Sequence, residues 1–283
     1  MKTSVVIDEL GHLFGMKNII PLIKDAGFEL VDYGSGAYHS ELFAKSDDEI
    51  RKVLLADKKM LNEYGLEVGQ MHAPFPSYPD DPEAFEHMIY NVSHSLRAAE
   101  IMECPYVVMH GALRCGWEPD DDREATRLLN VRILENLLPV AEETGVKLAF
   151  ENMPCTGIST SSPEEIIDII DTFKSKYLVA CLDTGHANMT EVKPAEFARL
   201  LGHRLEVLHI HDNMGNNDSH LPPYCGNIDW HDFSCALHEI GFDKSFSLET
   251  THLQHHMPFD ILKNIFPVEN MICRNIISLW SEA

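Results

Sequence analysis

Short apolar segments rich in β-branched residues alternate along the chain with longer segments in which apolar positions recur every three or four residues. Eight of the short segments are typical of the buried strands of a parallel sheet. We expect these strands at Thr3–Ile7, Leu30–Tyr33, Glu67–His72, Tyr106–His110, Lys147–Glu151, Leu178–Asp183, Glu206–Ile210 and Ser245–Glu249. The pattern therefore predicts eight successive strand–helix units.

The segments between the strands carry the start signals and apolar stripes of helices. Acidic residues at 47–49 and a proline at position 82 are typical of first helical turns, where negative charge favours the helix dipole and proline loses no hydrogen bond. Ser162, followed by a proline and two glutamates, is a typical N-cap. Four apolar residues between 134 and 141 form one stripe that would face a sheet.

Eight such units within 283 residues are most simply closed into a single-domain (β/α)8 TIM barrel that spans residues 1–283. The alternative is an open, doubly wound sheet. However, the first strand is not followed by the GxGxxG pattern of dinucleotide-binding sheets. The chain also has no low-complexity tract, like-charge block or Pro/Gly-rich linker that would divide it into two domains.

The charge balance argues against two classes of partner. The chain has 22 Lys and Arg residues against 45 Asp and Glu residues, a formal net charge of -23. Such an acidic surface repels phosphate backbones and anionic lipids, so we expect neither nucleic acid nor a membrane as a partner. Seven cysteines without a CxxC pair, no signal-peptide pattern and no long apolar run predict a cytoplasmic protein with free thiols.

A histidine or a carboxylate stands at the C-terminal end of six successive predicted strands. These residues are His72, His110, Glu151, Asp183, His209 and Glu249. Their spacings of 38, 41, 32, 26 and 40 residues each correspond to about one strand–helix unit. In a TIM barrel, the C-terminal strand ends surround the mouth at which catalysis takes place. Six such groups packed together are costly to desolvate unless a cation lies among them.

The six groups suit a divalent metal ion. Imidazole nitrogens and carboxylate oxygens favour Zn²⁺ or Mn²⁺, and no cysteine-rich site competes with them. His186 follows the end of the sixth strand and extends the set. Asp218 and His220 lie two residues apart in the loop after the seventh strand, so they can point the same way and join His186. A solvated polar loop is the alternative for this last pair.

At these residues the sequence resembles the xylose isomerase-like barrel superfamily. This superfamily contains sugar phosphate isomerases and epimerases, and also the apurinic-site endonucleases called endonuclease IV. The resemblance extends from His72 to Glu249. It is most specific at DTGH (183–186) and at HIHDN, DSHLPP and GNIDW within 209–230. The motifs FEN (150–152) and LET (248–250) are weaker.

The resemblance implies a metal-ligand role for nine residues. The ion shared by the epimerases would have its four ligands at Glu151, Asp183, His209 and Glu249. In the endonuclease branch a second ion, for which Glu151 is a bridge, has two further ligands that match His72 and His110. A third ion there has ligands that match His186, Asp218 and His220. In single-metal epimerases the residue that matches His186 contacts the substrate instead.

Three stretches depart from the patterns of the relatives, two of them from the ketose 3-epimerase branch. That branch usually has an arginine shortly after the strand-seven histidines, and a second glutamate shortly after the strand-five glutamate. This chain has Met214-Gly215 and Gly157-Ile158 in those neighbourhoods. The loop 221–226 is Leu-Pro-Pro-Tyr-Cys-Gly, where many relatives have a turn similar to Pro-Gly-Glu-Gly. The first two departures argue against a free-ketose 3-epimerase, whereas the loop alters the mouth beside the ligands and with it the choice of substrate.

Two activities fit these residues. In an isomerase or epimerase of a sugar, sugar phosphate or polyol, the metal would polarise a carbonyl and stabilise an enediolate. Glu151 and Glu249 would take and return a proton, and His186 would orient a substrate oxygen. Trp117, in the loop after the fourth strand, could contact one face of a sugar, or it could be a packing residue.

The alternative is a multinuclear zinc phosphoester hydrolase of the endonuclease IV type. Lysines and arginines are scarce in the predicted mouth loops, so its substrate would be a small ester and not DNA. A third hypothesis is a barrel whose metal is only structural. The number of ions, from one to three, stays open, as does the oligomeric state, a homo-oligomer included.

Overall fold

The computed structural model describes residues 1–34, 42–74 and 82–282. Its eight strands are parallel and form one sheet in the order β7-β6-β5-β4-β3-β2-β1-β8. A bridge between Ile210 and Leu248 joins the two edges, so the sheet closes into a nearly complete barrel and confirms the predicted (β/α)8 fold. The strands are β1 (Thr3–Val6), β2 (Leu30–Gly34), β3 (Glu67–His72), β4 (Tyr106–His110), β5 (Lys147–Glu151), β6 (Leu178–Asp183), β7 (Leu205–His209) and β8 (Phe246–Leu248).

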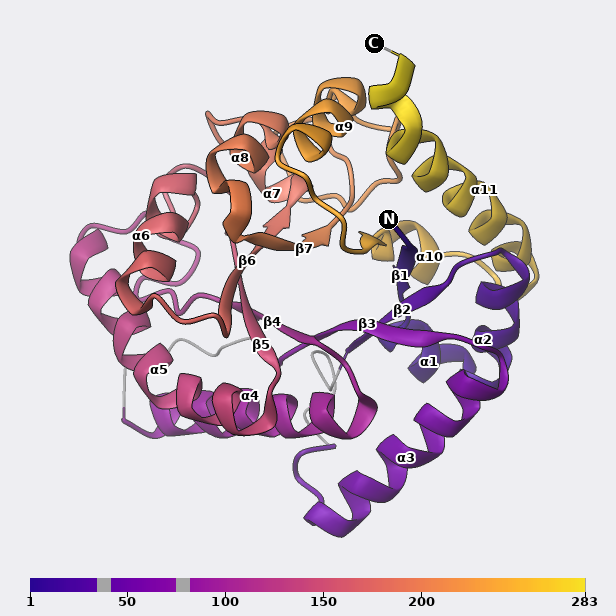
Figure 1. Ribbon diagram of the computed structural model, residues 1–283, viewed down its shortest axis with the longest axis horizontal. Coiled ribbons are helices and arrows are strands. Elements are labelled where there is room, and N and C mark those ends of the chain that lie inside the picture. Colours follow the sequence, from indigo (N-terminus) through magenta and orange to yellow (C-terminus); the bar gives the residue numbers. More distant parts are fainter. Residues whose placement is uncertain (35–41, 75–81, 283) are drawn as a thin grey trace.

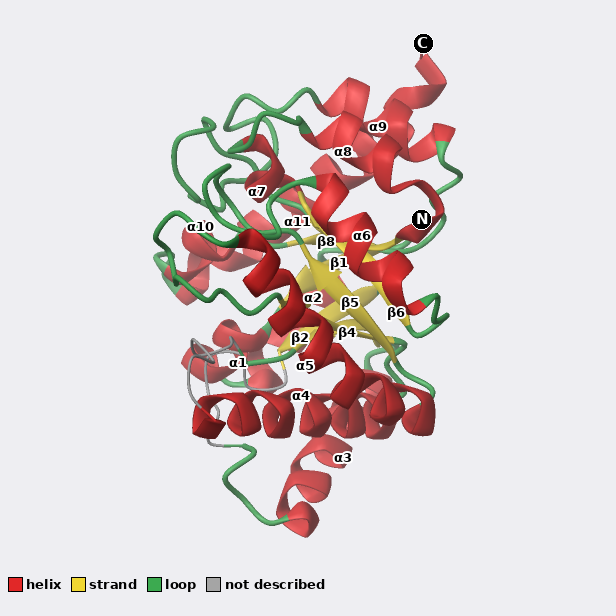
Figure 2. Ribbon diagram, turned by 90° about the vertical axis from the view of Figure 1, so that its left-hand side faces the viewer, coloured by secondary structure: helices red, strands yellow, loops and turns green. Residues whose placement is uncertain are grey.

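Helices surround the barrel, as Figure 1 shows. The α-helices are α1 (Asp8–Phe14), α2 (Met16–Asp25), α3 (Asp47–Glu63), α4 (Pro82–Met102), α5 (Arg123–Thr144), α6 (Pro163–Phe173), α7 (Thr184–Asn188), α8 (Pro194–Leu201), α9 (Trp230–Glu239), α10 (Thr251–His255) and α11 (Phe259–Ser278). Two 3₁₀ turns, η1 (Gly202–Arg204) and η2 (Leu279–Glu282), complete the set. In Figure 2 the short helices α7 and α10 lie among the loops on one side of the molecule. They follow the C-terminal ends of β6 and β8, so this side is the barrel mouth.

The helix starts follow the capping signals in the sequence. Ser46 precedes α3, and its backbone N–H donates to Glu49 Oε2 at 3.1 Å in a capping box. Ser162 accepts a hydrogen bond from the backbone N–H of Glu165 at 3.3 Å and begins α6 in the same way. Helix α4 begins at Pro82 as predicted, and the apolar stripe of α5 is buried, including Leu134.

The interior of the barrel is divided between an apolar half and a polar half. Strands β4 to β7 contribute a buried apolar cluster of Tyr106, Val108, Ala149, Val179, Cys181 and Val207. On the other side, β8, β1, β2 and β3 contribute buried polar residues, namely Ser247, Ser4, Asp32 and Gln70. Ser4 and Ser247 are register partners, so their side chains share one face of the sheet.

All seven cysteines are unpaired, as predicted for free thiols. None of the described helices is long and apolar enough to cross a membrane.

Candidate metal centre at the barrel mouth

The six strand-end candidates lie side by side at the mouth. Five of them are the last residue of their strand, and the sixth, Glu249, directly follows β8. Neighbouring strands also place them in register. His110 is paired with Glu151 across β4 and β5, and Asp183 is paired with His209 across β6 and β7. Because all the strands are parallel, the backbone itself brings these side chains together.

Glu151 lies at the centre of the cluster and is only 1% exposed. Its Oε2 lies 3.3 Å from His72 Nε2 and 3.1 Å from His110 Nε2. Its Oε1 lies 3.0 Å from His209 Nδ1 and 3.8 Å from His186 Nδ1. The two oxygens therefore face different histidines, which is the arrangement a carboxylate needs to bridge two ions.

Four residues, Glu151 among them, bring their ligand atoms close together. One ligand atom from each lies within 4.8 Å of the others, and the residues are Glu151, Asp183, His209 and Glu249. Three of these residues are fully buried, and the side chain of Glu249 is 14% exposed. Nitrogen and oxygen ligands at this spacing fit a single Zn²⁺ or Mn²⁺ ion.

The loop pair Asp218 and His220 joins His186, as the two-residue spacing suggested. Asp218 Oδ2 lies 3.3 Å from His186 Nε2 and 3.2 Å from His220 Nε2. The Nδ1 atoms of both histidines are held by backbone oxygens, at 2.8 Å for His186 and 3.0 Å for His220. Such backbone contacts orient a histidine so that its other nitrogen is free to bind a metal.

His211 was missed by the sequence reasoning. It is fully buried, and its Nε2 lies 2.9 Å from Asp183 Oδ2. Its ring stacks on that of His220, with centroids 3.9 Å apart and planes 12° apart. The signal that could have identified it is its two-residue spacing from His209, because alternate residues of an extended segment share a face.

Asp212, the next residue, shapes the loop that carries Asp218 and His220. Its carboxylate accepts hydrogen bonds from the backbone N–H groups of Tyr224 and Ile228 at 3.1 and 3.2 Å. It also accepts one from the Trp230 indole at 3.0 Å. One buried carboxylate therefore fixes both ends of this part of the mouth loop.

The charges of the site depend on one another. Burial opposes the charge on Glu151, but His209 and His110 bring the pKa of its carboxyl well below the usual value. Burial likewise opposes the charge on His186, while Asp183 and Asp218 raise the pKa of its imidazole well above the usual value. The pKa of His220 rises to about 9, against its own burial, through Asp218 and Glu249. The buried carboxylates are thus stabilised by positive charge next to them. Divalent ions would supply this charge in place of the protons on the histidines.

Glu269 of α11 is a buried carboxyl directly behind the mouth. It is 2% exposed, and it accepts hydrogen bonds from Thr250 Oγ1 at 2.6 Å and from Gln254 Nε2 at 2.9 Å. Burial raises the pKa of Glu269 to about 7, even though both hydrogen bonds lower it. The folded protein therefore favours the protonated form. The stability linked to that form is complete below pH 4.5 and is lost as the pH rises through about 7.

We expect Glu269→Gln to be more stable than the wild type at pH 9, by about 2–3 kcal/mol, and to show no such gain at pH 4.5. Glutamine keeps the shape of the side chain but does not have to release a proton in a buried site. Urea unfolding of both proteins at the two pH values measures the difference. The exposed Glu67→Gln variant is the control, and an equal effect of Glu269→Gln at both pH values would contradict the assignment.

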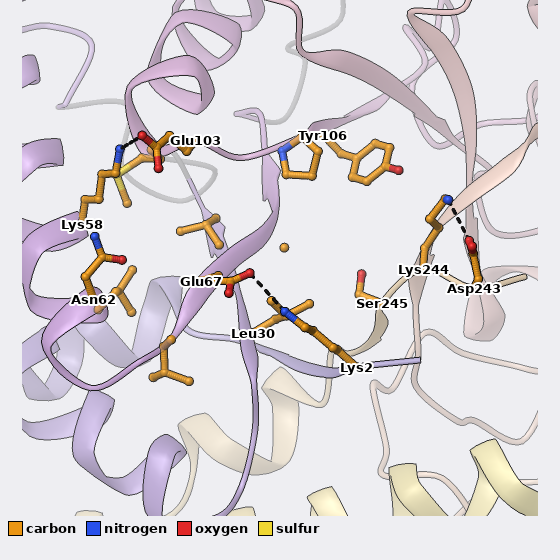
Figure 3. Close-up of a pocket in the computed structure, with 16 residues that line it drawn as sticks. Lys2, Leu30, Lys58, Asn62, Glu67, Glu103, Tyr106, Asp243, Lys244 and Ser245 are labelled. Atoms are coloured by element: carbon orange, nitrogen blue, oxygen red, sulfur yellow. Dashed lines mark hydrogen bonds and ion pairs between the residues drawn. The ribbon is translucent and has the colours of Figure 1, made fainter.

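A separate cavity of about 600 Å³ lies at the opposite, N-terminal end of the barrel (Figure 3). Its walls carry three lysine–carboxylate pairs: Lys58–Glu103 at 2.9 Å, Lys2–Glu67 at 3.2 Å and Lys244–Asp243 at 2.7 Å. None of the candidate ligands lines it. The mouth is therefore the candidate site for chemistry.

Trp117, in the loop between β4 and α5, is 60% exposed and is not a packing residue.

The fold and the cluster at its mouth define a TIM barrel that could bind metal ions. The chain belongs to the xylose isomerase-like TIM barrel family, whose sequence model matches residues 20–264.

Three curated relatives illustrate the range of the family. The chain is 35% identical over 146 residues to an uncharacterized protein of Methanocaldococcus jannaschii, which covers 50% of each chain. It is 25% identical over 246 residues to the D-psicose 3-epimerase of Enterocloster bolteae, covering 84% of this chain and 77% of that protein. It is 26% identical over 169 residues to a probable endonuclease 4 of Mycoplasmopsis pulmonis, covering 56% and 59%.

Solved structures agree on the fold. The crystal structure of the IOLI protein with a binding zinc atom has a TM-score of 0.79 at 16% identity and covers 99% of each chain. A D-tagatose 3-epimerase-like protein has a TM-score of 0.73 at 23% identity, covering 97% of this chain and 99% of the other. Sugar epimerases are thus prominent among the proteins that this chain resembles.

Proposed function

We propose that the chain is a divalent-metal-dependent isomerase or epimerase of a small sugar or polyol. The observation that carries this proposal is the group of four ligand atoms within 4.8 Å at the mouth, in which Glu151 and Glu249 both take part. A metal site that includes two carboxylates at the catalytic end of the barrel suits proton transfer next to a carbonyl. The epimerase relatives support the same class of reaction.

A bound Zn²⁺ or Mn²⁺ would polarise the substrate carbonyl and so acidify the neighbouring C–H bond. Glu151 or Glu249 then accepts the proton from that carbon, and the other glutamate returns a proton to the enediolate. Return to the opposite face inverts the carbon, whereas return to the adjacent carbon isomerises the sugar. His186, oriented by its 2.8 Å contact with the Asn152 backbone oxygen, holds a substrate oxygen. General acid–base help of this kind contributes about 10²–10⁴-fold.

The basic residues near the mouth favour a substrate without a phosphate group. The sequence after β5, β7 and β8, up to the next helix, contains no lysine or arginine. Among the described residues of the remaining loops, Arg114 is engaged by Asp120 at 3.1 Å, Lys193 donates to the Asn188 backbone oxygen at 2.9 Å, and the charge of Lys45 acts on Glu49 in the acidic first turn of α3. A phosphate at a strongly acidic mouth would lack the cationic partners that usually bind it.

A phosphoester hydrolase is the second candidate, because one observation favours it. His72, His110 and Glu151 form a further group of ligand atoms within 4.8 Å, next to the four-residue group. Shared by Glu151, the two groups could hold a pair of ions, which is typical of metal-dependent phosphoester hydrolysis. The shortage of free cations at the mouth counts against it.

Exchange of solvent deuterium into substrate distinguishes the two candidates. With metal-loaded protein in D₂O, we expect deuterium to enter a ketose or keto-polyol at the carbon next to the carbonyl, because both glutamates exchange protons with water. NMR of a panel of unphosphorylated sugars and cyclitols measures this incorporation. Glu249→Gln is expected to suppress it at least about 10²-fold.

The control for this experiment is Glu206→Gln. Glu206 lies in the N-terminal half of β7, and its carboxylate is paired with Lys147 of β5. This variant should leave the exchange unchanged. Turnover of a phosphodiester without deuterium incorporation into any member of the panel would contradict the isomerase proposal and support the hydrolase.

A further inference from the structure

We propose that Asp32 is a positioning residue that orients His209, so that His209 Nδ1 is the metal-binding atom and Nε2 carries the proton. Asp32 stands on β2, and neither the metal-ligand pattern nor the family resemblance singled it out. The inference rests on the proposed metal centre and goes beyond it, because it assigns how one ligand is held.

The two nitrogens of His209 face different groups. Nδ1 lies 3.0 Å from Glu151 Oε1 and 3.5 Å from Glu249 Oε2, on the side of the metal cluster. Nε2 lies 3.3 Å from Asp32 Oδ2, toward the polar half of the barrel interior. A ligand histidine commonly gives its second N–H to a carboxylate, which fixes both the tautomer and the ring orientation. Asp32 is placed to be that carboxylate.

The burial of Asp32 and His209 supports the positioning role of Asp32, in addition to the distance between the two side chains. Asp32 is 2% exposed and His209 is 1% exposed. Within the described residues, Asp32 Oδ1 and His209 Nε2 have no hydrogen-bond partner of good geometry. An enclosed carboxylate and an enclosed imidazole nitrogen are each costly without a partner, and a small rotation of either side chain pairs them.

Gln70 of β3 holds Asp32 in place. Its Nε2 donates to Asp32 Oδ2 at 2.8 Å and lies 3.2 Å from the backbone oxygen of Leu208, the residue before His209. Gln70 therefore ties the Asp32 carboxylate to the strand that carries the ligand. Ser245 Oγ, on the wall of the N-terminal cavity, donates to Gln70 Oε1 at 3.4 Å. A chain of polar contacts thus crosses the barrel from that cavity to the metal centre.

The variant Asp32→Asn tests the proposal with little change of shape. Asp32 Oδ2 faces both Gln70 Nε2 and His209 Nε2, so an asparagine oxygen at that position would be an uncharged, weaker acceptor for the His209 N–H, and an asparagine NH₂ group there would meet the Gln70 donor. We expect about 10- to 100-fold weaker zinc binding in a competition titration against a chromophoric chelator. The control is Asp57→Asn, which removes a carboxylate bound by Tyr33, the next residue of β2, at 2.8 Å. It should bind zinc as the wild type does.

A second measurement does not depend on how the variant folds. In the zinc-loaded wild type labelled with ¹⁵N-histidine, the signals of His209, assigned by their loss in His209→Gln, should show metal-bound Nδ1 and protonated Nε2. Metal-bound Nε2, or unchanged zinc affinity in a folded Asp32→Asn, would overturn the inference. Zinc binding by the wild type separates this failure from failure of the proposed function, which predicts that the wild type binds metal.

Discussion

Replacing Glu151 by glutamine is expected to remove the metal from the mouth and to lower the proposed isomerase activity by about 10³-fold or more. The two oxygens of Glu151 lie near four histidines, at 3.0 to 3.8 Å. An amide offers one uncharged oxygen, and its NH₂ group would face histidine nitrogens that should bind the same ions. Metal content after dialysis, measured together with sugar turnover, gives the result.

Glu206→Gln again serves as the control, because it removes a partly buried carboxylate that is paired with Lys147, at the N-terminal end of β7, and not with the candidate ligands. It should keep its metal and its activity. If Glu151→Gln retains metal with wild-type stoichiometry and affinity, Glu151 does not hold the centre together, and the bridging role assigned to it is wrong.

The substitution Gly185→Ala has the second largest expected effect. A Cβ atom at this position would lie 1.9 Å from His211 Cε1, far inside van der Waals contact. His211 is fully enclosed, so it cannot move without leaving Asp183 Oδ2, 2.9 Å away, and the stacked ring of His220. We expect a loss of about 3 kcal/mol in the free energy of unfolding and weaker metal binding at the mouth. Urea unfolding and metal titration measure the two effects.

Gly157→Ala is the matched control for this change. Gly157 lies at the mouth as well, in the loop between β5 and α6, but a Cβ there would meet nothing closer than 3.6 Å. Its stability should stay within about 0.5 kcal/mol of the wild type. A Gly185→Ala protein as stable as Gly157→Ala would show that His211 is not held as tightly as described.

Much of the framework could be predicted because it depends on regular geometry. Strand periodicity placed β3 to β6 with the bounds that the structure has, and the other strands within one residue. Parallel strands end on the same side of the barrel, so residues at those ends had to meet. This is why six ligand candidates, Glu151 among them, could be named from spacing alone.

The rest depends on irregular backbone and on contacts between distant residues. The position of Asp218 and His220 follows from the path of the loop, which the hydrogen bonds of Asp212 determine. His211 and Asp32 look like ordinary polar residues until the barrel shows which ring nitrogen or oxygen each one faces. Their roles are set by side-chain orientation, which periodicity does not encode.

The measurement that tests the central claim most directly is anomalous diffraction from crystals of the wild-type protein loaded with zinc. We expect at least one anomalous peak at the mouth, about 2.0–2.2 Å from an oxygen of Glu151 and from ligand atoms of Asp183, His209 or Glu249. A mouth without a peak after saturation with zinc, or zinc bound only by residues elsewhere on the protein, would contradict it.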